Sequence, residues 1–103
     1  MIMALYRIKS ISHSGTFGTR DLPREDGRYP RRVGRIVNLD LDKLDVGMPL
    51  TLDYVKDENG NDYSGYYLYC STIQGIHFVS DKVGCIETRN TIYEFEKVSD
   101  YYV

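Results

Sequence analysis

Long apolar runs and cysteines are scarce in this sequence of 103 residues. No segment approaches the roughly 18 consecutive apolar residues that a membrane-spanning helix needs, so we expect neither a membrane anchor nor a signal peptide. The two cysteines, Cys70 and Cys85, are too few for a disulfide framework. Their scarcity predicts reduced thiols and a cytoplasmic location.

Metal-binding motifs are also missing. The only soft metal ligands are the two cysteines together with His13 and His77, and none of them form the closely spaced pairs of structural zinc sites. The acidic group Asp40, Asp42 and Asp45 lacks the Gly and Glu that a calcium loop requires at set positions. We therefore expect no metal site and interpret the acidic group as a solvated turn.

Catalytic motifs are absent as well. Ser14 follows His13 directly, but neighbours in the sequence do not predict the spatial triad of a hydrolase. Residues 15–18, Gly-Thr-Phe-Gly, lack the Lys and the following helix of a phosphate-binding loop. The sequence therefore predicts a protein that is not an enzyme and uses no cofactor.

The overall composition is that of one globular domain. Apolar residues make up 42% and charged residues 27% of the chain, which is too apolar for a disordered segment. We expect a single β domain over residues 1–103.

Tyrosine is the enriched aromatic, with 10 copies against 3 phenylalanines and no tryptophan. Because tyrosine suits half-buried strand faces and interfaces, we predict tyrosine-lined strands and a homo-oligomer joined through their edges.

Alternating apolar and polar residues predict short strands separated by turns. The clearest is 50–56, where Leu50, Leu52 and Tyr54 alternate with polar residues. The predicted strands are 4–12, 35–39, 50–56, 63–72, 76–79, 83–88 and 91–98. Strands at this spacing, without amphipathic helices, predict an all-β fold. We expect a small antiparallel, partly open barrel, SH3-like or related, or a sandwich, with one long Arg- and Gly-rich loop.

Turn residues mark the connections between these strands. Asn59 and Gly60 supply the positive φ values that a tight hairpin demands. Leu41 and Leu44 fit one short helical turn that Gly47 closes, which is the only helix we predict. Residues 99–103 are interpreted as a linker.

The C-terminal half carries a loose sequence pattern. Its parts are the apolar strand 50–54, the segment Cys70-Ser71-Thr72-Ile73 and the run Glu87-Thr88-Arg89-Asn90-Thr91-Ile92-Tyr93-Glu94-Phe95. This half resembles small uncharacterised β proteins of Gram-positive gut bacteria and their phages, which often end in a Thr-x-Asn-Thr-x-Tyr-x-Phe pattern. The resemblance implies a β fold and a phage or mobile-element context, and it assigns no functional residue.

Charge is segregated into the long loop. Residues 13–35 hold six arginines and three acids, whereas the rest of the chain holds seven basic and twelve acidic residues. Every basic residue of the loop is Arg, whose planar fork can hold a phosphate or carboxylate through two hydrogen bonds. Interleaved glycines let backbone N–H groups approach an anion.

These features favour a binding module for a small phosphorylated ligand, such as a nucleotide or a cyclic oligonucleotide. In this interpretation arginines clamp phosphates while Tyr29 or Phe17 stacks on a base. The candidate ligand-binding residues are Arg28, Tyr29, Arg31, Arg32, Arg35, Phe17, Arg20 and Arg24. A long nucleic acid is disfavoured, because a net charge of −2 repels a polyanion outside the loop. If the phage resemblance holds, the module would sequester a host immune nucleotide signal.

Two other interpretations stay open. Neighbouring acids can neutralise the arginines in surface pairs that contribute little, in which case the loop only covers the barrel. The pairs would be Arg20 with Asp21, Arg24 with Glu25, and Arg28 with Asp26. Alternatively, the loop and exposed tyrosines dock on an acidic protein surface, as in a phage inhibitor of a host defence protein, or the chain is a structural subunit.

Overall fold

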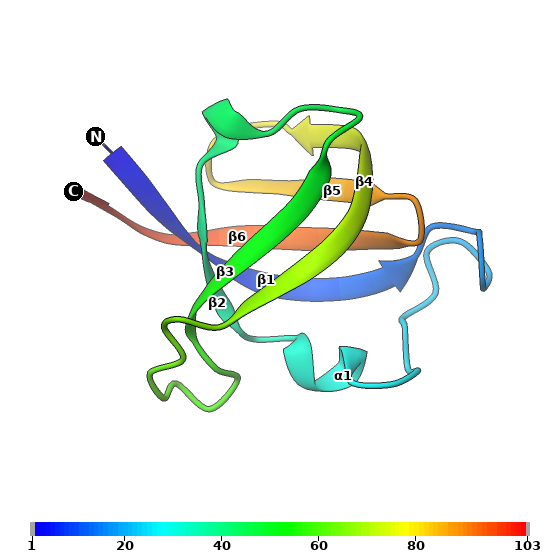
Figure 1. The fold of residues 1–103 in the computed structure, drawn as a ribbon, viewed down its shortest axis with the longest axis horizontal. Helices are drawn as coiled ribbons and strands as arrows, with labels where there is room; N and C mark the ends of the chain where they lie inside the picture. The colour runs from blue at the N-terminus through cyan, green and yellow to red at the C-terminus, as the bar shows by residue number, and fades with distance from the viewer. Residues whose placement is uncertain (1, 103) are drawn as a thin grey trace.

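The structure, a computed structural model, describes residues 2–102 and consists of six strands and two short helices (Figure 1). The elements are β1 (Ile2–His13), α1 (Tyr29–Arg32), β2 (Ile36–Leu39), the 3-10 helix η1 (Leu41–Lys43), β3 (Pro49–Lys56), β4 (Tyr67–Phe78), β5 (Val83–Thr88) and β6 (Thr91–Tyr102). None of the helices within residues 2–102 has the length and apolar character needed to cross a membrane.

The strands form a closed barrel in chain order, and each strand is antiparallel to its neighbours. The ring closes where β6 pairs with β1, from Ile2 opposite Tyr102 to His13 opposite Thr91. The predicted all-β antiparallel barrel is confirmed. We expected it to be partly open, but the ring of paired strands is complete.

Inward side chains from every strand fill the barrel. Along β3 the predicted alternation is confirmed, since Leu50, Leu52 and Tyr54 are buried and Thr51 and Asp53 are exposed. This alternation follows from the pleat, which points successive side chains to opposite faces of a strand. The buried apolar set is Tyr6, Ile8, Ile11, Val37, Leu39, Leu50, Leu52, Tyr54, Cys70, Ile73, Ile86, Tyr93 and Phe95.

β4 is one long, curved strand, where we predicted two strands over 63–72 and 76–79. Its first half pairs with β3 and its second half with β5, and the register shifts between Ile73 and Gly75. Glycine permits such a bulge, which bends a strand without ending it. Residues 63–66 belong to the preceding loop, and of the Asn59–Gly60 pair only Gly60 has a positive φ, of 85°.

Two further features differ from the prediction, and the predicted helical turn is confirmed. β6 continues to Tyr102, so residues 99–102 are strand and not linker, because they pair with β1. Val103 lies outside the described residues. The predicted helical turn is confirmed as η1, and Gly47 follows it with a φ of 95°. The long loop, which we expected to lack regular structure, contains α1, whose Pro30 lies in the first turn where its fixed φ favours a helix start.

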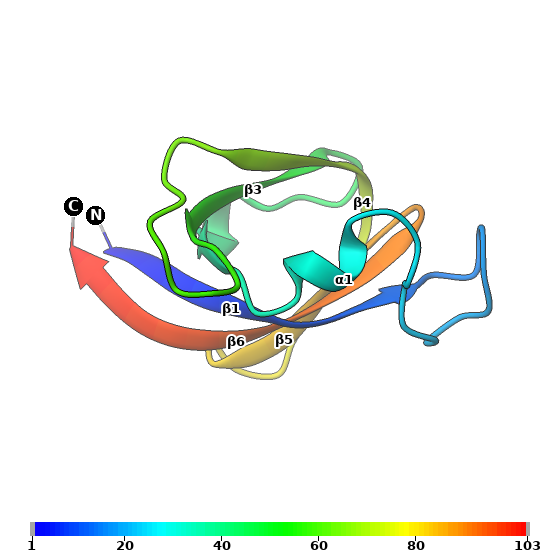
Figure 2. The same cartoon turned by 90° about the horizontal axis from the view of Figure 1, so that it is seen from below.

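Two loops lie at the same end of the barrel. The segment with α1 and the loop of residues 57–66 both lie at the lower end in Figure 1, and both face the viewer in Figure 2. Backbone hydrogen bonds fix the first of them to β1, because the Gly34 N–H donates to the Ile8 carbonyl at 2.8 Å and the Ile8 N–H donates to the Arg35 carbonyl at 2.9 Å. This end of the barrel therefore brings together loop residues far apart in sequence.

Candidate anion-binding cleft

A cleft of about 140 Å³ opens between these two loops. Three arginines of the long loop line one part of it, and tyrosines from the opposite half of the chain line the rest. We call it the Arg–Tyr cleft, and its lining residues are Arg28, Arg32, Arg35, Tyr54, Tyr63, Tyr66, Tyr67 and Leu68. The fold thus joins a positive segment to an aromatic one.

Backbone hydrogen bonds hold the tyrosine-bearing loop against β3. The Tyr63 N–H donates to the Val55 carbonyl, and the Tyr54 N–H donates to the Tyr66 carbonyl, both at 3.0 Å. The tyrosine rings then form a series. The centroids of Tyr54 and Tyr63 are 5.2 Å apart, and those of Tyr63 and Tyr66 are 4.6 Å apart with nearly parallel rings. The series runs from the buried Tyr54 to Tyr66, which is 62% exposed.

Arg35 lies against this aromatic series. The central carbon of its guanidinium is 4.9 Å from the centroid of Tyr54 and 5.0 Å from that of Tyr63. Its Nε donates to Glu58 at 3.2 Å, so the acid occupies only one side of the planar fork. Although burial opposes its charge, Tyr54 and Glu58 raise the pKa of Arg35. The guanidinium is therefore held in place and keeps its charge.

The Tyr54 hydroxyl is a buried polar group in this cleft. The residue is 5% exposed, and its hydroxyl makes no hydrogen bond of ordinary geometry to the described residues. Burial raises the pKa of this phenol, and the Arg35 guanidinium, which contacts the hydroxyl, opposes the rise together with the charge of Arg32. A buried hydroxyl without a good partner costs free energy, so a ligand oxygen that accepted its proton would stabilise the site.

Arg28 and Arg32 bring charge that no acid among the described residues neutralises. Within residues 2–102 neither guanidinium makes an ion pair. Arg32 packs on the ring of Tyr29 at 4.6 Å, which fixes its direction. Arg28 is exposed at the entrance to the cleft. The cleft therefore has an excess of positive charge, since of its three arginines only Arg35 is paired with an acid, Glu58, among the described residues.

Arg24 and Tyr29, two further predicted ligand-binding residues, lie outside the cleft lining. Arg24 donates to Asp26 and to the Thr91 hydroxyl, at 2.8 Å for the latter. The guanidinium also lies 3.9 Å from the Tyr29 centroid. The Tyr29 ring thus contacts Arg24 and Arg32 and supports the loop, where we predicted that it stacks on a base.

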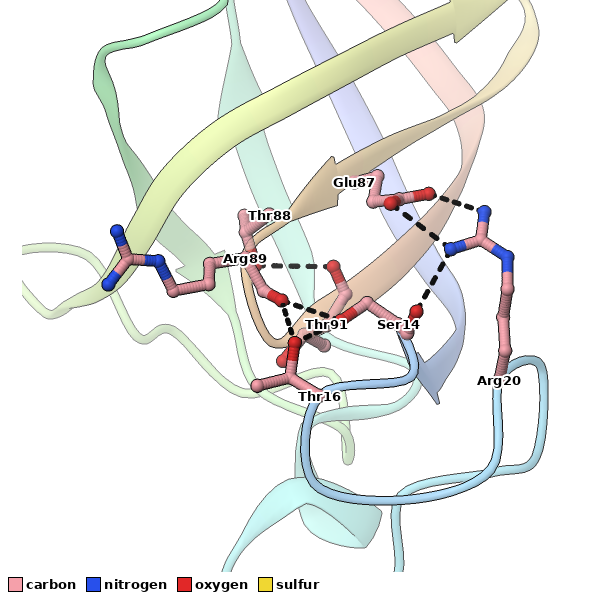
Figure 3. A network of polar contacts seen from close by, with 7 residues as sticks. All are labelled: Ser14, Thr16, Arg20, Glu87, Thr88, Arg89 and Thr91. Atoms are coloured by element: carbon pink, nitrogen blue, oxygen red, sulfur yellow. Dashed lines mark hydrogen bonds and ion pairs between the residues drawn. The ribbon is translucent and has the colours of Figure 1, made fainter.

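Arg20 anchors the tip of the long loop to β5 (Figure 3). It donates to both carboxylate oxygens of Glu87, at 3.1 and 2.6 Å, and to the Ser14 carbonyl at 3.0 Å. The hydroxyls of Ser14 and Thr16 both donate to the Arg89 carbonyl at 2.7 Å. The hydrogen bonds from Arg20 lower the pKa of the Glu87 carboxyl, and Glu87 in turn raises the pKa of Arg20. These contacts identify Arg20 as a loop anchor.

The remaining predicted residues do not join the cleft lining. Phe17 is 73% exposed near the tip of the loop, and Arg31 is exposed on α1 without an ion pair among the described residues. Of the expected surface pairs with neighbouring acids, none is formed. Arg20 pairs with Glu87, Arg24 with Asp26 and Arg35 with Glu58 instead.

Sequence reasoning missed the tyrosines of the cleft. Tyr63, Tyr66 and Tyr67 follow the Asn59–Gly60 turn in a close cluster, and we interpreted them as strand surface. Their density beside a turn was the available signal. Their pairing with the arginines depends on the pairing of β2 with β3, which places Ile36 opposite Lys56 and brings residues about 30 positions apart into one cleft.

Comparisons with known proteins give no relative: no protein-family model matches the chain, and no curated protein or solved structure matches it significantly. The resemblance to small β proteins of gut bacteria and phages therefore stays a prediction. Among the residues that the structure describes, no three His, Cys, Asp or Glu side chains gather as ligands for a metal ion.

Proposed function

We propose that this chain is a non-enzymatic binding module that captures a small anionic, nucleotide-like ligand in the Arg–Tyr cleft. The observation that carries the proposal is the convergence of Arg28, Arg32 and Arg35 on a cleft that tyrosine rings also line. Guanidinium groups bind phosphate through charge-assisted hydrogen bonds, and exposed tyrosine rings stack on bases. One cleft thus offers both kinds of contact that a nucleotide needs.

The size of the cleft supports a two-part binding mode. Clefts that enclose a whole small molecule usually have volumes of about 300–1,000 Å³, whereas this one measures about 140 Å³. It suits the charged group of a ligand, while the rest would lie over the rim. The rim carries Tyr66 and Tyr67, which are 62% and 64% exposed.

In the phage context that the sequence resemblance implies, such a module would sequester a host immune nucleotide signal. Sequestration needs binding without turnover, and we accordingly propose no reaction at this site. The free concentration of the signal would fall in proportion to the amount of module present.

A thermal-shift screen with nucleoside monophosphates, cyclic mononucleotides and cyclic dinucleotides tests the proposal. A ligand that binds only the folded state must raise the melting temperature. At a hundredfold excess over Kd it adds about 2.7 kcal/mol to the free energy of unfolding. We expect at least one nucleotide class to do so. If no nucleotide changes the melting temperature of the folded protein, the proposed function is wrong.

Arg31 and Arg32 provide a matched pair of variants for the same ligand. They are neighbours on α1, but only Arg32 lines the cleft. We expect R32Q to weaken binding about tenfold or more, since a hydrogen bond to a charged group contributes about 1.5–3 kcal/mol. R31Q, with the same change of net charge, should alter Kd less than twofold. Equal losses in the two variants would indicate only a general charge effect.

A protein-interaction module is the second candidate, and the outer surface favours it. Arg31 on α1 and Tyr69 on β4 are exposed outside the cleft, and both residue types are common in interfaces. The partner would present an acidic surface, or a second copy of the chain would dock through outward tyrosines. Light scattering measures the oligomeric state, and binding to an acidic protein that survives R32Q but not R31Q would favour this candidate.

A further inference from the structure

The Arg–Tyr cleft leads from an exposed rim to a buried floor. Arg28, Tyr66 and Tyr67 are exposed at the rim, whereas Tyr54, on β3, is 5% exposed. The β3 backbone that carries Tyr54 is paired with β2 on one side and with β4 on the other. A ligand group that enters past the tyrosines therefore meets the wall of the barrel.

From this shape we propose that the cleft binds the terminal phosphate of a phosphomonoester and discriminates against phosphodiesters. The inference rests on the proposed function and names its ligand class. A terminal phosphate has one substituted oxygen, which can point back to the rim. A diester has two substituted oxygens, and the substituents on both of them would have to leave the cleft through the same small opening.

The charges in the cleft agree with a doubly charged phosphate. Arg28 and Arg32 have no acid partner among the described residues, and Arg35 shares its charge with Glu58. A phosphomonoester carries a charge of about −1.5 to −2 at pH 7. A diester carries a single negative charge and leaves more of the positive charge unbalanced.

The hydrogen-bond donors also match a group with several free oxygens. Glu58 accepts from Nε of Arg35 and the guanidinium also contacts the Tyr54 hydroxyl, which leaves further N–H groups of this fork to donate to a ligand. The buried Tyr54 hydroxyl contacts Arg35, which can only donate, and among the described residues its own proton has no acceptor, so it can donate to a phosphate oxygen. A terminal phosphate offers three unsubstituted oxygens to these donors, whereas a diester offers two.

The tyrosine series then defines where a base would lie. Tyr63 covers one face of the Tyr66 ring at 4.6 Å, and Tyr66 is 62% exposed. A base outside the cleft would continue this stack while the phosphate occupies the interior. The ligand class is therefore a nucleoside monophosphate or an oligonucleotide with a terminal phosphate.

Calorimetric titration with three matched probes tests the inference. We expect adenosine 5′-monophosphate to bind at least tenfold more tightly than adenosine 3′,5′-cyclic monophosphate, which has the same base and a diester. Adenosine alone should bind too weakly to measure. Equal or tighter binding of the cyclic nucleotide would overturn the inference. If none of the three binds, and no other nucleotide shifts the melting temperature, the proposed function itself fails.

Tyr54 and Tyr69 provide the matched variants. Tyr54→Phe removes the buried hydroxyl and keeps the ring, whereas Tyr69→Phe makes the same change on the exposed face of β4. We expect Y54F to weaken binding of adenosine 5′-monophosphate about threefold to tenfold, with a ligand-free melting temperature equal to or above that of the parent. Y69F should leave Kd unchanged. Equal Kd values for the two variants would remove Tyr54 from the site and contradict the inference.

Discussion

Arg24 shows at the scale of one residue how the long loop is fixed to the barrel. Its guanidinium donates to Asp26 in the loop and to the Thr91 hydroxyl at the start of β6. The same group packs on Tyr29 of α1 at 3.9 Å, and the side chain is only 9% exposed. One cation thus links the loop, the helix and the barrel, which places α1 beside the cleft.

Removal of this side chain should destabilise the fold. Arg24→Ala leaves the buried Thr91 hydroxyl without its donor and exposes the Tyr29 ring, so we expect a loss of about 1–2 kcal/mol in the free energy of unfolding. Urea denaturation followed by circular dichroism measures this loss. Arg31→Ala, on an exposed residue of α1, should have almost no effect. An R24A protein as stable as R31A would show that the contacts do not stabilise the loop.

At the scale of elements, the loop of residues 57–66 positions half of the cleft. The Asp57 carboxylate accepts from the N–H groups of Asn59 and Asn61, both at 2.9 Å, and these hydrogen bonds lower the pKa of Asp57. Gly60 has a φ of 85°, which side chains disfavour. This turn fixes the positions of Glu58 and Tyr63, and through them the orientation of Arg35.

A substitution at Gly60 should therefore affect both stability and binding. Gly60→Val places a β-branched residue at a left-handed φ, which costs about 1–2 kcal/mol. We expect a lower urea midpoint and weaker nucleotide binding, because Tyr63 and Glu58 would shift. Asn59→Val, at a neighbouring exposed position without a positive φ, should change the urea midpoint and the nucleotide affinity less. Unaltered binding by a destabilised G60V would mean that the turn does not shape the cleft.

The elements also show which parts of the fold the sequence could predict. Strands with clear alternation, such as β3, were predicted because burial on one face leaves a period of two. β4 was divided in two because Gly75 interrupts its pattern at the bulge, and α1 was missed because four residues are too few for a helical period. The end of β6 was missed because its polar residues resemble a linker, although pairing with β1 makes them strand.

The same limits apply to the candidate site. The six arginines of the loop were recognisable from composition, but their partners were not. Local reasoning paired Arg24 with Glu25 and Arg20 with Asp21, whereas the structure places Arg20 against Glu87, across 67 positions. Only barrel closure decides such contacts. The sequence predicted Arg28, Arg31, Arg32 and Arg35 as one phosphate-binding group, of which Arg31 lies outside the cleft lining. It did not predict the tyrosines opposite them.

At the scale of the whole molecule, titratable groups limit stability at both ends of the pH range. Arg20 lowers the pKa of Glu87, and Lys97 lowers that of Asp81. Because the pKa values of these carboxyls are lower in the folded state, their ionised forms stabilise the fold at pH values above the pKa of the unfolded state. This stabilisation is lost as the pH falls through the pKa values of the folded state. At the other end, burial raises the pKa values of Cys70, Tyr54 and Tyr93. These groups are neutral at lower pH and then stabilise the fold. The stabilisation is lost as the pH rises through their pKa values in the folded state.

We therefore expect a plateau of the melting temperature between about pH 5 and 8, with a decline below about pH 4 and another above about pH 10, where unfolded carboxyl and phenol groups titrate. Melting curves recorded by circular dichroism across this range measure both limbs. Glu87→Gln removes one of the shifted carboxyls and should make the acid limb shallower. A melting temperature that stays constant down to pH 3 would contradict this account.

The pairing of β1 with β6 also determines when the chain can fold. Ile2 lies opposite Tyr102 and His13 opposite Thr91, so β1 finds its main partner 78 to 100 positions later in the chain. Contacts this distant in sequence carry a large loop-closure entropy and slow the search for the native state. On the ribosome, β1 would wait with an exposed apolar face until β6 leaves the exit tunnel. Until then, the exposed apolar face of β1 is the kind of surface that promotes aggregation of incomplete chains.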